Sequence, residues 1–188
     1  MQMRNGNIIL RYIRESDIDS YIRWTTTETE WSEWDAPWET DDGDDFVARQ
    51  RASLSVTPKS FGKLEIDTDF GQHVGWVSSY CIDGNKEKTA VGIDVPPRSA
   101  RGKGYGKSAL SLFMAYLFSC CDKETLYTQT WSGNTVMLRL AEKIGFNEIE
   151  RIKNIRIVRG DAYDALTFSI SRAEFFNRYP DLRNTCYL

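Results

Sequence analysis

Apolar residues along this chain change their spacing several times, and each spacing predicts a different kind of element. Stretches in which apolar and polar residues alternate have the period of two that a half-buried strand requires. The predicted strands lie at residues 8–14, 60–67, 74–82, 88–95, 126–131, 147–158 and 163–171. Turn-forming residues at 67–71 and 83–86 separate the second, third and fourth of them, so we expect these three strands to pair antiparallel.

Segments with helical spacing lie between the strands. Ser16 or Asp17 can cap a helix that runs to about Thr25, and an acidic helix follows to about Ser55. A long helix is expected from 104 to about 120, another ends at a glycine cap at 145, and 173–178 adds a short last one. The apolar stripes that indicate the two central helices are Leu110, Phe113, Met114 and Leu117, then Met137, Leu140 and Ile144.

The order of these elements predicts a mixed α/β (α+β) fold without internal repeats. The chain has 188 residues, of which 41% are hydrophobic and 13% aromatic. That length supports one domain with a substantial core, whereas a second full domain would be cramped. We therefore expect residues 1–188 to form a single domain.

A basic, glycine-dense turn follows the strand at 88–95 and leads directly into the long helix. Gly102, Gly104 and Gly106 let the main chain turn sharply and approach a ligand closely. The free N–H groups of the helix that follows would face that ligand, and no acidic residue occurs between Pro96 and Cys121. The pattern predicts a site for a phosphate or pyrophosphate.

Spacing excludes two well-known phosphate loops. A P-loop requires a glycine where Arg101 stands, and a dinucleotide-binding Gly-x-Gly-x-x-Gly that starts at Gly102 requires a glycine where Lys107 stands. Arg/Gln-x-x-Gly-x-Gly/Ala after a strand does fit, as Arg101-Gly-Lys-Gly-Tyr-Gly106. This turn resembles the acyl-CoA pyrophosphate loop of the GNAT N-acetyltransferase superfamily.

Two downstream segments carry the same resemblance. Residues 134–146, Asn-Thr-Val-Met-Leu-Arg-Leu-Ala-Glu-Lys-Ile-Gly-Phe, are similar to the family's second signature, an asparagine that opens a helix closing in Lys-Leu-Gly-Phe. Residues 159–170 resemble the turn and last strand of the RimJ/RimL-like branch, the ribosomal-protein alanine acetyltransferases. The resemblance covers roughly residues 7–175, and its specific motifs lie in 91–175.

The resemblance implies a fold and a donor site. The fold would be a mixed, largely antiparallel twisted sheet flanked by helices, with the strands at 88–95 and 125–131 splayed apart. Acetyl-CoA would be the cosubstrate, and its pantetheine arm would lie between those strands. Main-chain groups of Ile93 and Val95 would bind the arm, and the Val95 N–H would polarise the thioester carbonyl. Asn134 would contact the arm, although its position suits a helix N-cap equally well. The pyrophosphate would be held by Arg101, Gly102, Lys103, Gly104, Tyr105, Gly106 and Lys107.

The residues that the family uses as general acid are missing. Many members have a tyrosine where this chain has Ala141, and in the ribosomal-protein branch a serine stands where it has Met137. The hydroxyls nearest to the splayed strands are Tyr127, Ser132 and Tyr105, and packing or surface roles explain them as well. Asp94 could act as a base through water, but an error of one residue in register would turn it to the other face.

An acidic segment rich in tryptophan distinguishes this chain on the acceptor side. Residues 24–48 contain nine carboxylates and no Lys, Arg or His. By resemblance this region forms part of the acceptor site, so we expect a cationic amine such as a polyamine, an aminoglycoside-like sugar or a basic peptide N-terminus. A solvated acidic loop whose tryptophans cover the core is the alternative. The acceptor candidates are Trp31, Trp34, Asp35 and Trp38.

Composition limits the compartment and the partners. Four cysteines without Cys-x-x-Cys spacing and the lack of an apolar signal segment favour the cytoplasm, and no apolar run is long enough for a membrane span. A net charge of −3 argues against nucleic acid. The single histidine, His73, makes a metal site or a Ser-His triad improbable, and we expect it at the surface. The resemblance is compatible with a homodimer.

Two functions follow for the chain as a whole. The first is a CoA-dependent N-acetyltransferase that acts on the primary amine of a small molecule or of a peptide N-terminus, by direct attack in a ternary complex. The second is a non-catalytic acyl-CoA-binding or regulatory protein on the same fold, which the missing acids at 137 and 141 keep open.

Overall fold

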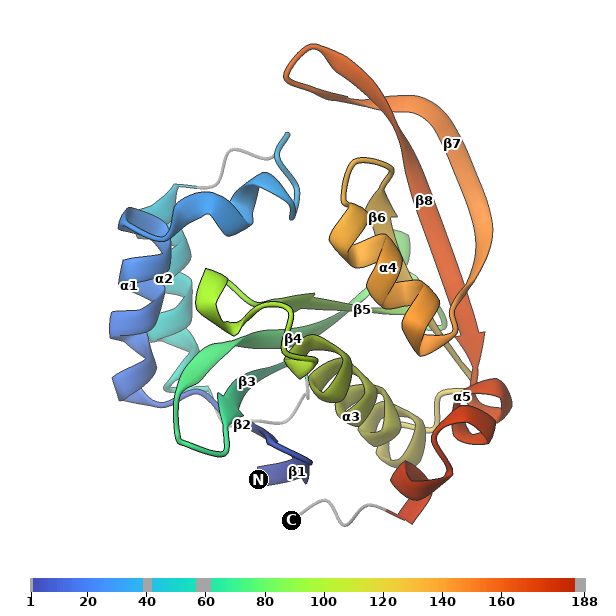
Figure 1. Cartoon of the computed structure of the whole chain (residues 1–188), viewed down its shortest axis with the longest axis horizontal. Coiled ribbons are helices and arrows are strands. Elements are labelled where there is room, and N and C mark those ends of the chain that lie inside the picture. Colours follow the sequence, from blue (N-terminus) through green and yellow to red (C-terminus); the bar gives the residue numbers. More distant parts are fainter. Residues whose placement is uncertain (1, 39–41, 57–61, 185–188) are drawn as a thin grey trace.

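The computed structural model describes residues 2–38, 42–56 and 62–184 and shows an eight-stranded sheet with helices on both faces (Figure 1). The strands are β1 (Gln2–Asn5), β2 (Ile8–Arg11), β3 (Lys63–Thr68), β4 (His73–Cys81), β5 (Thr89–Asp94), β6 (Thr125–Trp131), β7 (Asn147–Val158) and β8 (Asp161–Ser171). The α-helices are α1 (Ile18–Thr26), α2 (Gly43–Ser53), α3 (Tyr105–Cys120), α4 (Thr135–Ile144) and α5 (Arg172–Arg178). The strand order is β1-β2-β3-β4-β5-β6-β8-β7, and each neighbouring pair is antiparallel except β5 with β6. The predicted mixed, largely antiparallel sheet flanked by helices is confirmed.

The N-terminal strands differ from the prediction. β1 was not predicted, because four residues with a single buried apolar side chain, Met3, are too short to show a period. β2 ends at Arg11 instead of residue 14, because its pairing with β1 and β3 stops there and the chain turns into a 3-10 helix at Glu15–Asp17. The side chain of Arg11 forms ion pairs with Asp17 and Asp67. The predicted start of the next strand, at residues 60 and 61, lies outside the described residues.

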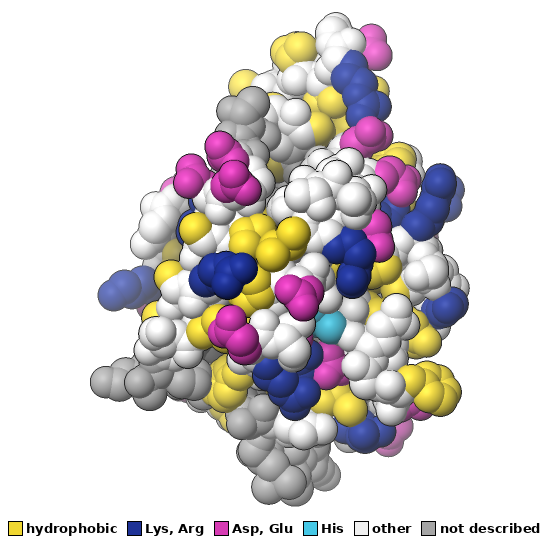
Figure 2. Space-filling view, turned by 90° about the vertical axis from the view of Figure 1, so that its left-hand side faces the viewer, with side chains coloured by type: hydrophobic (Ala, Val, Ile, Leu, Met, Phe, Trp, Pro, Cys, Tyr) yellow, Lys and Arg dark blue, Asp and Glu magenta, His cyan; other side chains and the backbone are white. Residues whose placement is uncertain are grey.

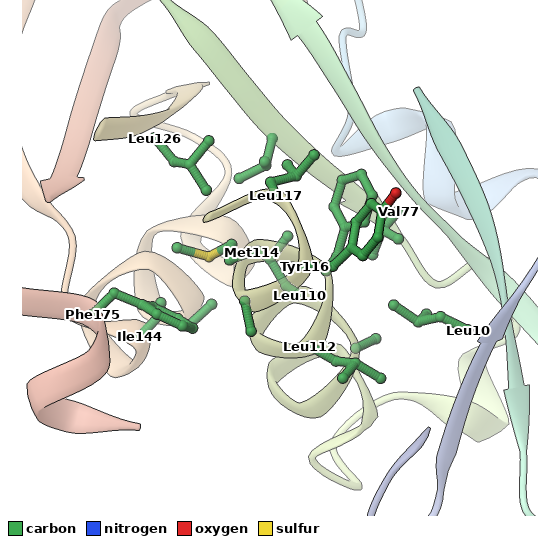
Figure 3. Packing of buried hydrophobic residues seen from close by; sticks show 14 of the residues in the cluster. Leu10, Val77, Leu110, Leu112, Met114, Tyr116, Leu117, Leu126, Ile144 and Phe175 are labelled. Atoms are coloured by element: carbon green, nitrogen blue, oxygen red, sulfur yellow. The ribbon is translucent and has the colours of Figure 1, made fainter. Parts of the chain in front are cut away.

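The larger core lies between one face of the sheet and α3. Leu64, Ile66, Val77 and Val91 point from the strands toward this helix. Every side chain of α3 from Ala109 to Phe118 is buried, because α4 and α5 cover the side of the helix that the sheet does not reach. Figure 3 shows α3 between Val77 and Leu10 on one side and Ile144 and Phe175 on the other. Within the described residues, no helix has the length and apolar character needed to cross a bilayer.

A second, smaller core lies on the opposite face of the sheet, under α1 and α2. Trp76 is adjacent in β4 to Val77, so its side chain points away from α3. It packs with Tyr21 and Trp24 of α1, with ring centroids 5.3 and 5.8 Å away. The helices α1 and α2 therefore hold an aromatic cluster over one face of β3 and β4. On the same face, β5 and β6 are covered by the segment that connects α1 to α2.

The prediction that His73 lies at the surface is wrong. Only 7% of its side chain is exposed, and its Nε2 lies 2.9 Å from Glu65 Oε2. Its Nδ1 lies 3.6 Å from Asp17, and its ring is 4.8 Å from that of Trp24. Figure 2 shows the α1 and α2 side of the molecule, on which acidic, basic and hydrophobic side chains lie interspersed. The position at a hairpin entry suggested exposure, but α1 covers it.

Candidate functional site

The strands β5 and β6 separate toward their carboxyl ends. Their register contains one pair, Ala90 opposite Tyr127, whereas β5 pairs with β4 along its whole length. The hydroxyl of Thr128 donates to the main-chain oxygen of Val91 at 2.9 Å and closes the narrow end. Ile93 and Val95 lie beyond this point, at the open end. The sheet thus provides a gap between two parallel strands, as expected for the predicted donor strands.

The glycine turn lies at the open end of this gap. Gly102 has φ 74° and Gly104, the N-cap of α3, has φ 83°, and a Cβ at either position would meet no atom within 4 Å. A Cβ at Gly106 would lie 3.8 Å from Ile93 Cδ1 and 3.9 Å from Leu140 Cδ2. The turn therefore sits between β5 and α4, with the first N–H groups of α3 beside the gap. This arrangement suits an anion next to an extended chain.

The side chain of Arg101 holds the start of the turn in place through hydrogen bonds. Its Nε donates to the oxygen of Val95 at 3.0 Å, and its Nη2 donates to the oxygen of Pro96 at 2.7 Å. Its Nη1 lies 3.2 Å from the carboxylate of Glu30. Because these groups occupy the guanidinium, a diphosphate here would rely on the main-chain N–H groups of the turn and of the first turn of α3.

Asn134 caps α4 and also holds the segment that connects α1 to α2. Its side-chain oxygen accepts from the N–H of Met137 at 2.9 Å, which is the N-cap contact expected from the sequence. Its Nδ2 donates to the main-chain oxygen of Trp34 at 2.6 Å, and the indole N–H of Trp131 donates to the same oxygen at 3.1 Å. The second contact joins residues one hundred positions apart, and local sequence contains no signal for it.

The connecting segment, residues 27–38, thus reaches across the open end of the gap. Glu30 contacts Arg98 and Arg101 of the turn, and Glu33 pairs with Arg159 of the β7–β8 hairpin at 3.0 Å. Trp38 packs edge-on against Trp131 and lies under the guanidinium of Arg156 at 4.4 Å. A cavity of about 420 Å³ remains between the segment and the turn, lined by residues 27–30, Pro96, Arg98 and Ser99.

The four predicted acceptor residues have different surroundings. Trp31 belongs to the aromatic cluster, since it packs edge-on against Trp76 at 5.3 Å and donates its indole N–H to the oxygen of Trp24. Trp34 contributes its main-chain oxygen to Asn134 and Trp131. Of these four residues, only Asp35 lies close enough to Asp94 to raise the pKa of its carboxyl. Glu39 and Asp41, also counted in the acidic segment, lie outside the described residues.

The register places Asp94 on the face of the sheet that α1 and α2 cover. It stands opposite Trp76, whose indole N–H is hydrogen-bonded to the Asp94 carboxylate. Burial, and next the negative charge of Asp35, raise the pKa of Asp94 well above its usual value. By this register the Asp94 side chain lies beside the open end of the gap, on the face of the sheet away from α3. Because its pKa is raised, its carboxylate is a stronger base than that of an exposed aspartate.

The hydroxyl candidates are dispersed. Tyr127 stands at the narrow end of the gap, opposite Ala90, and Tyr105 packs against the α3 core. Ser132 accepts from the N–H of Asp164 at 3.0 Å, so it joins the end of β6 to β8.

Sequence reasoning missed Tyr80, which lies on the same face as Trp76. Its hydroxyl donates to Gln129 at 3.4 Å, and burial together with Asp35 raises its pKa to about 12. The alternation of β4, which puts residues 76, 78 and 80 on one face, could have indicated it.

Comparison with known proteins finds a family match and a shared fold. The family model described as an acetyltransferase (GNAT) domain matches residues 7–147. Over 75 residues the chain is 31% identical to the SPbeta prophage-derived uncharacterized N-acetyltransferase YokL of Bacillus subtilis (strain 168), and the match spans 40% of this chain and 42% of that protein.

Two solved structures have the same fold at low identity. RimL, a ribosomal-protein alpha-N-acetyltransferase solved in complex with coenzyme A, has a TM-score of 0.75 and 14% identity over 91% of this chain and 98% of that one. Spermidine N-acetyltransferase from Vibrio cholerae, in complex with CoA and spermine, has a TM-score of 0.72 and 15% identity over 92% of this chain and 100% of that one.

Proposed function

Because this chain belongs to the GNAT acetyltransferase family, we propose that it transfers an acetyl group from acetyl-CoA directly to the primary amine of a cationic acceptor. The observation that carries the proposal is the continuity of the donor side. The opened strand β5 runs into the glycine turn, and the turn runs into the N-terminus of α3. One continuous stretch of main chain could thus bind both an extended arm and a diphosphate.

In the proposed donor site, the pantetheine arm lies against the main chain of Ile93 and Val95, as an added strand at the open end of the gap. The diphosphate lies on the N–H groups of residues 102–107, where two glycines with positive φ keep side chains away. The N–H of Val95 points to the thioester oxygen and stabilises negative charge that develops there. Arg101 supports this geometry by fixing the oxygens of Val95 and Pro96.

On the acceptor side, Asp94 is the proposed proton acceptor. It takes a proton from the acceptor ammonium, whose neutral nitrogen then attacks the thioester carbon as the carbon–sulfur bond breaks. A thiol has a pKa of roughly 8.5, so the thiolate is a good leaving group, and it can take up through water the second proton that the acceptor nitrogen loses as the amide forms. Because the thiolate can leave without a general acid, the reaction does not require the serine and tyrosine that the family has where this chain has Met137 and Ala141.

The proposed acceptor class is a cationic amine, of which a polyamine is the first example. Asp35 and Asp94 put two carboxylates beside the gap, and two negative charges favour a cation there. Spermidine N-acetyltransferase, which shares the fold, supports the class. A basic peptide N-terminus has the same charge and is the alternative acceptor, which the likeness to RimL supports.

A second candidate function is acyl-CoA binding without transfer. Ala141 favours it, because this residue is fully buried against the core and leaves no acid at that position. Thiol release from acetyl-CoA in the presence of polyamines, aminoglycosides, amino acids and basic peptides, with acceptor-free controls, distinguishes the two functions. Acceptor-dependent release supports the transferase. CoA binding without release across the panel supports the binding protein.

The variant Gly104→Asp tests the donor site itself. A carboxylate at the N-cap of α3 would repel a diphosphate, so we expect CoA binding to be lost in calorimetry while the circular dichroism spectrum is unchanged. Gly6→Asp is the matched control, since Gly6 also has a positive φ and open space around its Cβ position but lies in the β1–β2 turn. Equal CoA affinity in the two variants would place the donor site elsewhere.

A further inference from the structure

A lysine occupies an aromatic cage beside the proposed acceptor site. The ammonium of Lys63, on β3, lies 4.5 Å from the ring centroid of Trp76 and 4.6 Å from that of Tyr21. It also donates to the side-chain oxygen of Gln50 in α2 at 2.6 Å. Aromatic faces around an ammonium are the usual means of binding a ligand cation, but here the cation belongs to the protein.

Trp76 connects this lysine to Asp94. Lys63 stands over the face of the indole ring, and the N–H on the edge of the same ring is hydrogen-bonded to the Asp94 carboxylate. A positive charge over the ring draws electron density from the N–H and makes it a stronger donor. Lys63 also acts on Asp94 directly, since its charge favours the ionised carboxylate.

The other charged groups around Lys63 are already engaged. Glu65 of β3 accepts from the hydroxyl of Tyr21 at 2.7 Å, and it lies 2.9 Å from His73 Nε2 on β4. Asp17, before α1, is bound by Arg11. Arg49 of α2 adds a positive charge near Lys63, and Asp35 of the connecting segment adds a negative one near Asp94. Within the described residues, Asp94 is thus the carboxylate that is connected to the Lys63 ammonium through Trp76, which contacts both side chains.

We propose that Lys63 is a positioning residue for the acetyl transfer: through Trp76 it favours the ionised form of the Asp94 carboxylate and orients it toward the acceptor amine. This role rests on the proposed function, in which Asp94 accepts the proton. Desolvation lowers the pKa of Lys63 to about 8, and Glu65 and Asp94 act in the opposite direction. The ammonium is therefore the predominant form at pH 7, where the role requires its charge.

The experiment is an NMR titration of ¹³C-labelled aspartate carboxyls, with the Asp94 signal assigned by its loss in Asp94→Asn. We expect Lys63→Met to raise the titration midpoint of Asp94 by about 1 pH unit, because an adjacent positive charge is removed. Lys63→Arg should restore the midpoint of the unsubstituted protein. Trp76→Phe retains a ring but lacks the N–H, so it should also raise the midpoint, and it provides a second test if Lys63→Met does not fold.

An Asp94 midpoint equal in the unsubstituted protein, Lys63→Met and Trp76→Phe would overturn the proposal. The proposed function is tested separately by thiol release from acetyl-CoA with spermidine in Asp94→Asn. If thiol release is lost in Asp94→Asn while the Asp94 midpoint is unchanged in Lys63→Met, Asp94 is the proton acceptor and Lys63 has no positioning role. A moved midpoint with full release in Asp94→Asn would remove Asp94 from catalysis, and Lys63 with it.

Discussion

At the scale of single residues, Gly75 determines the position of Asp94. A Cβ at Gly75 would overlap the main-chain oxygen of Asp94 and come within 3.1 Å of Val95 Cα. Glycine at this position lets β4 and β5 pair closely beside the open end of the gap. Glycine in the middle of this strand is therefore required both by the neighbouring main chain and by its own φ of 153°, which residues with a side chain rarely adopt.

Gly75→Ala should lower the free energy of unfolding by about 1–3 kcal/mol, because an added methyl in a packed site forces the backbone apart. Urea unfolding measures the loss. Gly92→Ala, on the facing strand, is the matched control: its Cβ would lie 3.3 Å from the hydroxyl of Ser78, a side chain that can rotate away. Losses of the same size in both variants would contradict the steric role of Gly75.

Asp17 makes the stability depend on pH. It is 2% exposed and accepts from Arg11 Nη1 at 2.6 Å and from Arg11 Nη2 at 2.8 Å. Burial alone would raise the pKa of Asp17, but the hydrogen bonds from Arg11 and from the N–H of Arg14 lower it below its usual value. A carboxyl with a lowered pKa in the folded state stabilises the protein above its unfolded pKa, and this contribution is lost as the pH falls through the folded pKa.

We therefore expect the free energy of unfolding to decline as the pH falls below about 4. Asp17→Asn should be destabilised by about 3 kcal/mol at pH 7, since the charge of Arg11 loses a partner, and its stability should depend less on pH in the acid range. Urea unfolding at several pH values measures both. Asp19→Asn, an exposed position in the first turn of α1, should keep the original pH dependence. An unchanged acid slope in Asp17→Asn would argue against this assignment.

At the scale of elements, the segment at 27–38 couples the two sides of the gap. Its Glu30 lies 3.2 Å from Arg101 and 3.7 Å from Arg98, two cations of the turn proposed to bind phosphate. Its Trp34 occupies the amide of Asn134, which resemblance assigns to the pantetheine arm. The segment and the donor would therefore compete for some of the same groups.

Glu30→Gln should raise the affinity for CoA roughly two- to fivefold, because it removes a negative charge beside the turn proposed to bind phosphate, in a partly exposed site. Calorimetry measures the change. Glu28→Gln is the matched control, since Glu28 pairs with Arg23 of α1, 3.2 Å away, and not with the turn. A CoA affinity that is lower in Glu30→Gln, or changed equally in both variants, would show that the two sides do not compete.

At the scale of the whole molecule, two apolar clusters share one continuous sheet. The larger surrounds α3, and the smaller lies under α1 and α2 on the other face. Because β4 contributes Val77 to the larger cluster and Trp76 to the smaller one, we expect residues 1–188 to unfold as a single domain in one transition. Three of the six tryptophans lie in or against the smaller cluster, and none belongs to the larger one. Tryptophan fluorescence therefore does not report on the larger cluster directly, whereas far-ultraviolet circular dichroism reports on all helices. Coincident midpoints in urea are expected, and separate midpoints would indicate two independent units.

The sequence by itself determined the local features of this protein. The glycine turn, the long helix after it and the Asn134 cap follow from neighbouring residues, and the structure has each of them at the expected place. The alternation of apolar residues likewise predicted seven of the eight strands. Such features depend on backbone conformation and on contacts within a few residues, so short segments contain the required information.

Only the tertiary structure decided which distant residues meet. The register of β4 with β5 turned Asp94 toward Trp76, the fold of the connecting segment brought Trp34 to Asn134, and α1 covered His73. The sequence around Lys63 does not indicate its aromatic cage, because the rings that form the cage belong to distant elements, α1 and β4. A shift of one residue in strand pairing would reverse each face, and that register depends on packing across the whole sheet rather than on any local stretch.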